Sequence, residues 1–148
     1  MLKRLGLVSA ISLMIATPAL ADSGACGSEP IAPAIPSAAE MGQKSPADAQ
    51  KMKHQAFLDI RQWQGALKDY RGCLDGDVAS IKRDRANAAS QTKPDQDRIN
   101  GFDAKIKADQ QANDRSADDE ERVVNDFNNL STAFCARADT DKSSCPKS

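Results

Sequence analysis

One long amphipathic stretch, residues 54–83, constrains the fold of this chain more than any other feature. Large apolar side chains recur in it at steps of three and four, the spacing of an α-helix; they are Phe57, Ile60, Trp63, Leu67, Tyr70, Leu74, Val78 and Ile81. At about 100° per residue, all eight fall inside an arc roughly 140° wide. A helix with one apolar stripe must bury that stripe, so we expect a second element packed along it.

The first helix is predicted over about residues 46–90. Ser45 is a good N-cap, Pro46 suits the first helical position, and Asp48 can complete a capping box. Gly72 and Gly76 leave open whether the helix is continuous or breaks in two. An isolated glycine costs only about 1 kcal/mol, and the apolar arc continues beyond both glycines. We therefore predict a continuous helix, with a local bend as the alternative.

A second helix is predicted over about residues 94–137, beginning at Pro94 after a turn. Its apolar residues are Ile99, Phe102, Ile106, Val123, Val124, Phe127, Leu130 and Phe134. Two helices of similar length across a short turn favour an antiparallel arrangement. The predicted fold class is all-α, a long antiparallel two-helix, coiled-coil-like hairpin over residues 45–138. Facing residues would have numbers that add to about 187, which places large side chains opposite one another at the open end.

The N-terminus has the pattern of a cleavable signal peptide, residues 1–21. Lys3 and Arg4 precede an apolar run, and small residues stand before a cleavage site after Ala21. The run is shorter than the roughly 20 residues of a transmembrane helix. We therefore predict a periplasmic or secreted protein, with no transmembrane segment after cleavage.

Two further segments are predicted to lie outside the hairpin. Residues 22–44, rich in proline and alanine, indicate a disordered linker, and residues 139–148 a polar tail. Lipidation at Cys26 is an alternative that Ser23 disfavours, because a lipoprotein signal has a large aliphatic residue there. Without Lys3 and Arg4 the chain holds 18 basic and 21 acidic residues, a net charge of −3. Nucleic acid is therefore not expected as a partner.

The middle of the second helix does not match the first. Between residues 107 and 122 it offers small and polar side chains opposite Leu67, Tyr70, Leu74 and Val78. These four residues form the candidate interaction face, because a contiguous exposed apolar patch often marks an interface. A protein partner or a second copy would cover it. The alternative is close packing against alanines, with Asn113 buried as a register device.

The four cysteines lie in the exported part, where disulfides persist, and they are Cys26, Cys73, Cys135 and Cys145. Cys73 and Cys135 would be about 30 Å apart in the hairpin, too far for a bridge. We favour Cys26–Cys73 with Cys135–Cys145. The rival is Cys26–Cys145, with Cys73 free or bridging a dimer.

No catalytic, cofactor-binding or metal-binding residue is predicted. His54, the only histidine, points about 160° away from the apolar arc. The acidic run at residues 118–121 points in all directions around a helix. The stretch at residues 139–143 begins like a calcium loop but lacks its glycine and its closing glutamate. No phosphate-binding or hydrolase motif occurs.

A Tyr-x-x-Cys-Leu block at residues 70–74 resembles a group of short exported bacterial proteins of uncharacterised function. The resemblance extends over about residues 57–134. It implies a helical hairpin and no activity. Cys26, Cys135 and Cys145 lie outside the block, so the resemblance implies no disulfide pairing.

The sequence therefore predicts a non-enzymatic, exported helical hairpin that acts as an interaction or structural module in the cell envelope. The alternative is a periplasmic carrier of a small ligand or a metal, using carboxylates and Cys73.

Overall fold

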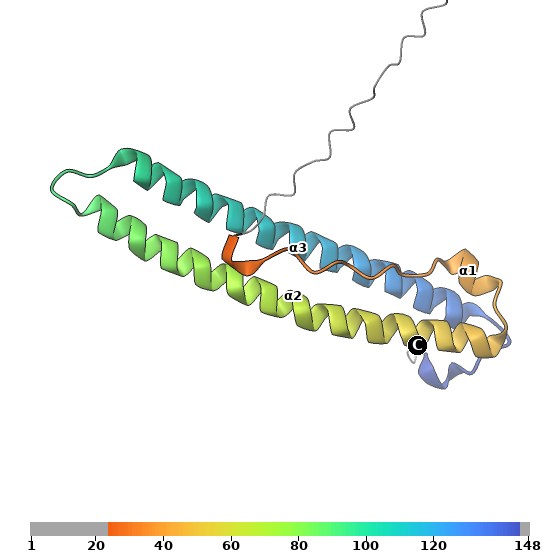
Figure 1. Ribbon diagram of the computed structural model, residues 1–148. Helices are drawn as coiled ribbons and strands as arrows, with labels where there is room; N and C mark the ends of the chain where they lie inside the picture. The colour runs from red at the N-terminus through yellow and green to blue at the C-terminus, as the bar shows by residue number, and fades with distance from the viewer. Residues whose placement is uncertain (1–23, 146–148) are drawn as a thin grey trace, which may run out of the picture.

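The computed structural model describes residues 24–145, and they form the predicted all-α hairpin (Figure 1). Its two long helices, α2 (Pro46–Ala89) and α3 (Gln96–Ala136), lie side by side and antiparallel. Three short elements accompany them: η1 (Gly24–Cys26), α1 (Ala38–Gly42) and η2 (Lys142–Ser144). The predicted signal peptide lies outside the described residues. No helix among residues 24–145 is both long and apolar enough to cross a membrane.

Helix α2 begins and continues as predicted. The Ser45 hydroxyl accepts a hydrogen bond from the Asp48 amide at 3.2 Å, and Pro46 occupies the first turn. The helix runs unbroken through Gly72 and Gly76. A Cβ atom added at either glycine would have no neighbour within 4 Å, so neither glycine marks a close contact inside the hairpin.

Helix α3 begins two residues later than predicted. Asp95 is its N-cap, and the Asp95 carboxylate accepts a hydrogen bond from the Arg98 amide at 3.1 Å. An N-cap residue has extended backbone angles, here φ −85° and ψ 103°, so the preceding Pro94 falls in the turn. The prediction that Pro94 opens the helix was wrong, because the carboxylate one residue on provides the stronger cap.

Contacts between the two helices agree with the predicted register. Ring centroids of Phe57 and Phe127 lie 6.2 Å apart, Arg71 donates to Ser116, and Arg85 pairs with Asp103. The core divides into two clusters. The middle cluster contains Ile60, Trp63, Leu67, Tyr70, Leu74, Ala112 and Val123. The open-end cluster contains Met41, Ala49, Ala56, Leu130 and Phe134.

The described part of the predicted linker is ordered, which corrects the expectation of disorder for residues 24–44. Residues 27–36, which we call the strap, run along the two helices from η1 to α1 (Figure 1, orange). The Trp63 indole Nε1 donates to the Pro30 carbonyl at 3.1 Å, and Ala32 and Ile35 pack against the middle cluster. The strap is ordered because it buries apolar side chains and because a disulfide fixes its first end.

Candidate functional site

The candidate interaction face on α2 is covered in the structure. Leu67, Tyr70 and Leu74 have exposed fractions of only 1%, 6% and 1%, and Val78 is partly buried. The expectation that these four side chains form an exposed patch was therefore wrong. The strap, which was predicted to be part of a disordered linker, packs against the same cluster through Ala32 and Ile35. A partner cannot dock on these side chains as predicted, because they are buried within the chain.

The middle of α3 packs closely against the same stripe. Ala112 is 2% exposed and Ser116 is fully buried, and both are small enough to bring the two helices together. This agrees with the alternative of close packing against small residues. Asn113, however, is only partly buried, and Ser116 holds the buried polar position instead.

A polar clamp joins the helices beside Ser116. Arg71 Nε donates to Ser116 Oγ at 2.7 Å, and Arg71 Nη1 forms an ion pair with Glu120 at 2.6 Å. Gln64 adds a hydrogen bond to Glu120 at 2.9 Å. The bond from Arg71 is the main reason that the pKa of Glu120 lies below its ordinary value. Every member has a partner, so the clamp fixes register without leaving an orphaned charge.

The two disulfides have the favoured pairing of the two predicted. Cys26 bridges to Cys73 with a Cα–Cα distance of 5.7 Å, and Cys135 bridges to Cys145 at 5.8 Å. The rival pairing of Cys26 with Cys145 does not occur, and no cysteine among the described residues is free. The first bridge anchors the strap to the middle of α2. The second folds the tail back onto the end of α3; of the predicted polar tail, residues 139–148, the structure describes residues 139–145.

A small polar cavity of about 400 Å³ lies between α2 and α3 near Val78. Asp109 lines it, with 2% of its surface exposed, and its Oδ2 atom has no hydrogen-bond partner. Burial raises the pKa of Asp109, although Lys105 Nζ lies 3.9 Å from that oxygen. No group of three or more metal-ligating side chains occurs within residues 24–145. The unpaired Asp109 carboxylate destabilises the folded state, and the cavity is not a candidate binding site.

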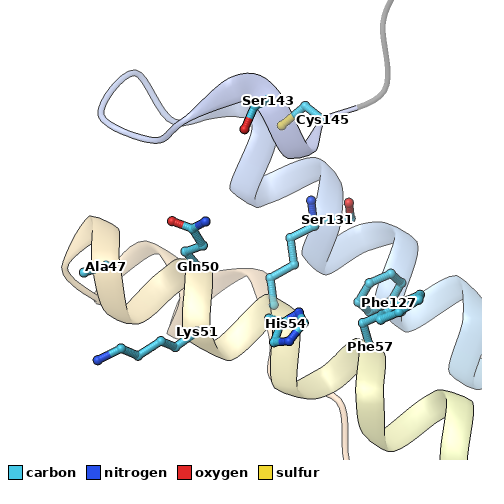
Figure 2. Close-up of a pocket in the computed structure, with 10 residues that line it drawn as sticks. Ala47, Gln50, Lys51, His54, Phe57, Phe127, Ser131, Ser143 and Cys145 are labelled. Carbon is cyan, nitrogen blue, oxygen red and sulfur yellow. The ribbon is translucent and has the colours of Figure 1, made fainter.

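A larger cavity, of about 830 Å³, lies at the open end of the hairpin and is the candidate functional site (Figure 2). Its size is within the range of about 300–1,000 Å³ typical of ligand pockets. Helix α2, helix α3 and the folded-back tail line it. The lining residues are Ala47, Gln50, Lys51, Lys53, His54, Phe57, Phe127, Ser131, Ser143 and Cys145.

The apolar part of the open-end cavity is unusually exposed for this chain. The Phe57 and Phe127 rings lie together at its base, tilted by 43° (Figure 2). Phe57 is 46% exposed, and Leu58 next to it is 45% exposed. The only other large hydrophobic residue so exposed within residues 24–145 is Ile31, at 95% on the strap. Of these three exposed side chains, Phe57 lines the cavity.

Two lysines make the polar part of the cavity positively charged. Lys51 and Lys53 come from α2, as does His54, and none of the described lining residues is acidic. Lys53 Nζ lies 4.7 Å from the centroid of the Phe134 ring, and burial lowers the pKa of Lys53. His54 is exposed, as its position on the helix predicted, but it also faces the cavity.

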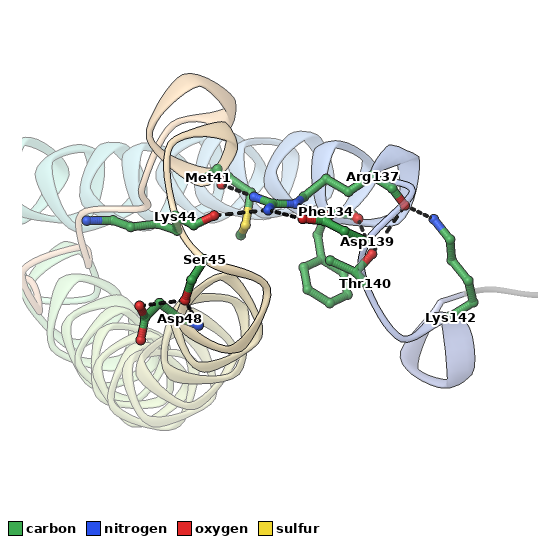
Figure 3. A network of polar contacts seen from close by, with 9 residues as sticks. All are labelled: Met41, Lys44, Ser45, Asp48, Phe134, Arg137, Asp139, Thr140 and Lys142. Carbon is green, nitrogen blue, oxygen red and sulfur yellow. Dashed lines mark hydrogen bonds and ion pairs between the residues drawn. The ribbon is translucent and has the colours of Figure 1, made fainter.

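Helix α1 and the tail lie at the same end of the hairpin, and Arg137 at the end of α3 contacts both (Figure 3). Its guanidinium donates to the Met41 carbonyl at 2.6 Å and to the Lys44 carbonyl at 2.9 Å. It also pairs with Asp139 at 2.8 Å. The calcium-like stretch is thus committed to internal contacts, since Asp141 accepts from the Ser143 amide at 2.8 Å.

Sequence reasoning missed the cavity, although one signal was present. On the helical wheel Phe57 stands at the edge of the apolar arc, about 60° from the nearest of the other seven residues. That offset directs its ring to the flank of α2 that carries His54, away from the central seam. The contribution of the tail had no such signal, because it depends on the Cys135–Cys145 bridge.

Comparisons with protein-family models, with curated proteins and with solved structures give no match for this chain. The resemblance at residues 70–74 therefore stays a prediction. The geometry alone bears on function: a hairpin whose strap and tail are each fixed by a disulfide, a covered middle, and a cavity at the open end lined by aromatic rings and lysines.

Proposed function

We propose that this protein is a non-enzymatic, exported interaction module of the cell envelope, and that it binds its target through the open-end cavity. One observation carries the proposal: Phe57, an aromatic side chain that is 46% exposed, lines the cavity of about 830 Å³ at the open end of the hairpin. A concave, mostly apolar surface with a few convergent polar groups is the usual form of a binding site.

Binding is favoured over catalysis by the residues that line the cavity. A hydrolytic or acid–base site needs a nucleophile or a base with an orienting partner within hydrogen-bond reach. His54 is the only histidine, and the described lining offers it no carboxylate; the lining cysteine, Cys145, is in a disulfide. The metal-carrier alternative is likewise weakened, since the Cys73 sulfur is in a disulfide rather than present as a thiolate.

Export to an oxidising compartment is part of the same proposal. The signal-peptide pattern at residues 1–21 supports it, and so do two disulfides in a chain of 148 residues. Mass spectrometry of a periplasmic extract tests it: the expected product is the chain beginning at Asp22 with both bridges formed. A full-length or reduced product in the cytoplasm would contradict export.

A titration with N-phenyl-1-naphthylamine, an uncharged apolar fluorescent probe, tests the binding surface. We expect a saturable rise in fluorescence with the mature protein. Phe57→Asp should abolish the rise, because a carboxylate would then stand in the apolar base of the cavity. Ile31→Asp is the matched control: Ile31 is equally apolar and more exposed, but lies on the strap. Equal loss in both variants, or no binding by the wild type, would refute the proposal.

A further inference from the structure

We infer that the open-end cavity binds a small amphiphilic anion, specifically a single-chain alkyl carboxylate. This inference rests on the proposed function, since it names the ligand class of the same site. Two observations carry it: the separation of the cavity into apolar and cationic parts, and the absence of acidic residues from its described lining.

The apolar part suits an alkyl chain. Phe57 and Phe127 present adjacent rings, and Ala47 and the Cys135–Cys145 bridge add small apolar surface. Burial of apolar surface is favourable, so a chain of several carbons laid against the exposed Phe57 ring gains binding energy. The volume of about 830 Å³ accommodates one such molecule.

The cationic part suits a single carboxylate. Lys51 and His54 lie about one turn apart on the same flank of α2, and Lys53 reaches the cavity from the side nearer the core. Gln50 and Ser131 supply further hydrogen-bond donors around them, whereas Ser143 already donates to the Asp141 carboxylate. The whole chain has a net charge of −1, so this positive spot is local and not a consequence of composition. An anion gains from these groups, whereas a cation is repelled.

The same charges argue against the other occupants of such a surface. Two copies meeting at this end would bring lysines against lysines. A bilayer surface is contacted by protruding apolar side chains over a broad area. Here the exposed large hydrophobic residues at the described open end are only Phe57 and Leu58, and the apolar rings line a concavity. A monomeric amphiphile is the occupant that fits both the shape and the charge.

The test is displacement of N-phenyl-1-naphthylamine from the mature, disulfide-bonded protein by three ligands that share one alkyl chain, all kept below micelle formation. We expect dodecanoate to displace the probe at a concentration about tenfold lower than dodecyltrimethylammonium, with dodecanol between them. Equal potency of dodecanoate and dodecyltrimethylammonium would overturn the inference while leaving the proposed function intact. Failure of the probe itself to bind would remove both.

Variants then locate the charge effect. The double variant Lys51→Gln, Lys53→Gln should weaken dodecanoate about tenfold and leave probe affinity unchanged, and arginine at both positions should restore dodecanoate binding. Lys68→Gln, an exposed lysine farther along α2, is the matched control and should have no effect. An unchanged dodecanoate affinity in the glutamine variant refutes the inference; if that variant unfolds by circular dichroism, the ligand series on the wild type decides alone. Co-sedimentation with phosphatidylglycerol vesicles, without displacement by monomeric dodecanoate, would show a bilayer site instead and would also refute it.

Discussion

Removing the Cys26–Cys73 bridge should release the strap and expose the stripe that it covers. The perturbation is the double variant Cys26→Ser, Cys73→Ser, which leaves no unpaired thiol. The bridge joins positions 47 residues apart, and the chain-entropy relation for a closed loop of that length gives about 4 kcal/mol of stability at 25 °C. The second bridge spans only 10 residues, so its removal should cost less, about 3 kcal/mol.

Trp63 makes the consequence directly measurable. It is the only tryptophan, and its indole donates to Pro30 on the strap. When the strap detaches, the emission of Trp63 should shift to longer wavelength, because water reaches an indole that is now 5% exposed. The helical circular dichroism signal should persist, since α2 and α3 still pack on each other through the polar clamp and the open-end cluster.

Urea unfolding followed by both signals is the assay. We expect the double variant to lose about 4 kcal/mol of unfolding free energy and to show the red-shifted emission before any urea is added. The matched control, Cys135→Ser with Cys145→Ser, should keep the native emission. A loss below about 1 kcal/mol, together with unchanged emission, would refute the reasoning, because the strap would then be held by its own packing.

Three further predictions concern buried and clamped residues, each measured by chemical or thermal unfolding. Leu74→Ala should lower the unfolding free energy by about 2–5 kcal/mol, whereas Leu58→Ala, at a half-exposed position, should change it by less than about 1 kcal/mol; equal effects would contradict the assigned core. Glu120 has a lowered pKa, so it stabilises the folded state above its ordinary pKa of 4.5, and this stability is lost as pH falls through the lowered pKa. Glu120→Gln should therefore reduce the decrease in unfolding free energy at acid pH. An unchanged dependence of unfolding free energy on pH would contradict the clamp. Asp109 has a raised pKa, so the folded state loses stability as pH rises from 3.8 through that raised pKa. Asp109→Asn should therefore raise the unfolding free energy by about 1–3 kcal/mol at neutral pH and leave it unchanged in acid. A destabilised variant would contradict the assignment of an unpaired buried carboxylate.

The long helices were predictable because their signals are local. A run of apolar residues at steps of three and four fixes which face of residues 54–83 is buried, and Ser45 with Pro46 fixes where α2 begins. The hairpin follows, because two stripes of equal length on one chain can bury each other only by folding back. The disulfide pairing was also accessible, since the long helices hold Cys73 and Cys135 too far apart to bridge.

The state of Leu67, Tyr70 and Leu74 was not predictable from local pattern. Whether that stripe is exposed depends on residues 27–36, whose proline-rich composition is the same for a free linker and for a strap that packs in place. The long-range bridge and the Trp63–Pro30 bond decide between these two states, and neither leaves a periodic trace in the sequence.

The sequence by itself determined the two long helices and their register. Only the tertiary structure decided which surface is open. The strap covers the middle of the hairpin, whereas the flank of α2 that carries Phe57 stays exposed beside Lys51 and Lys53. The physical reason is that helix formation depends on neighbours three and four residues away, whereas exposure depends on what the rest of the chain places on top.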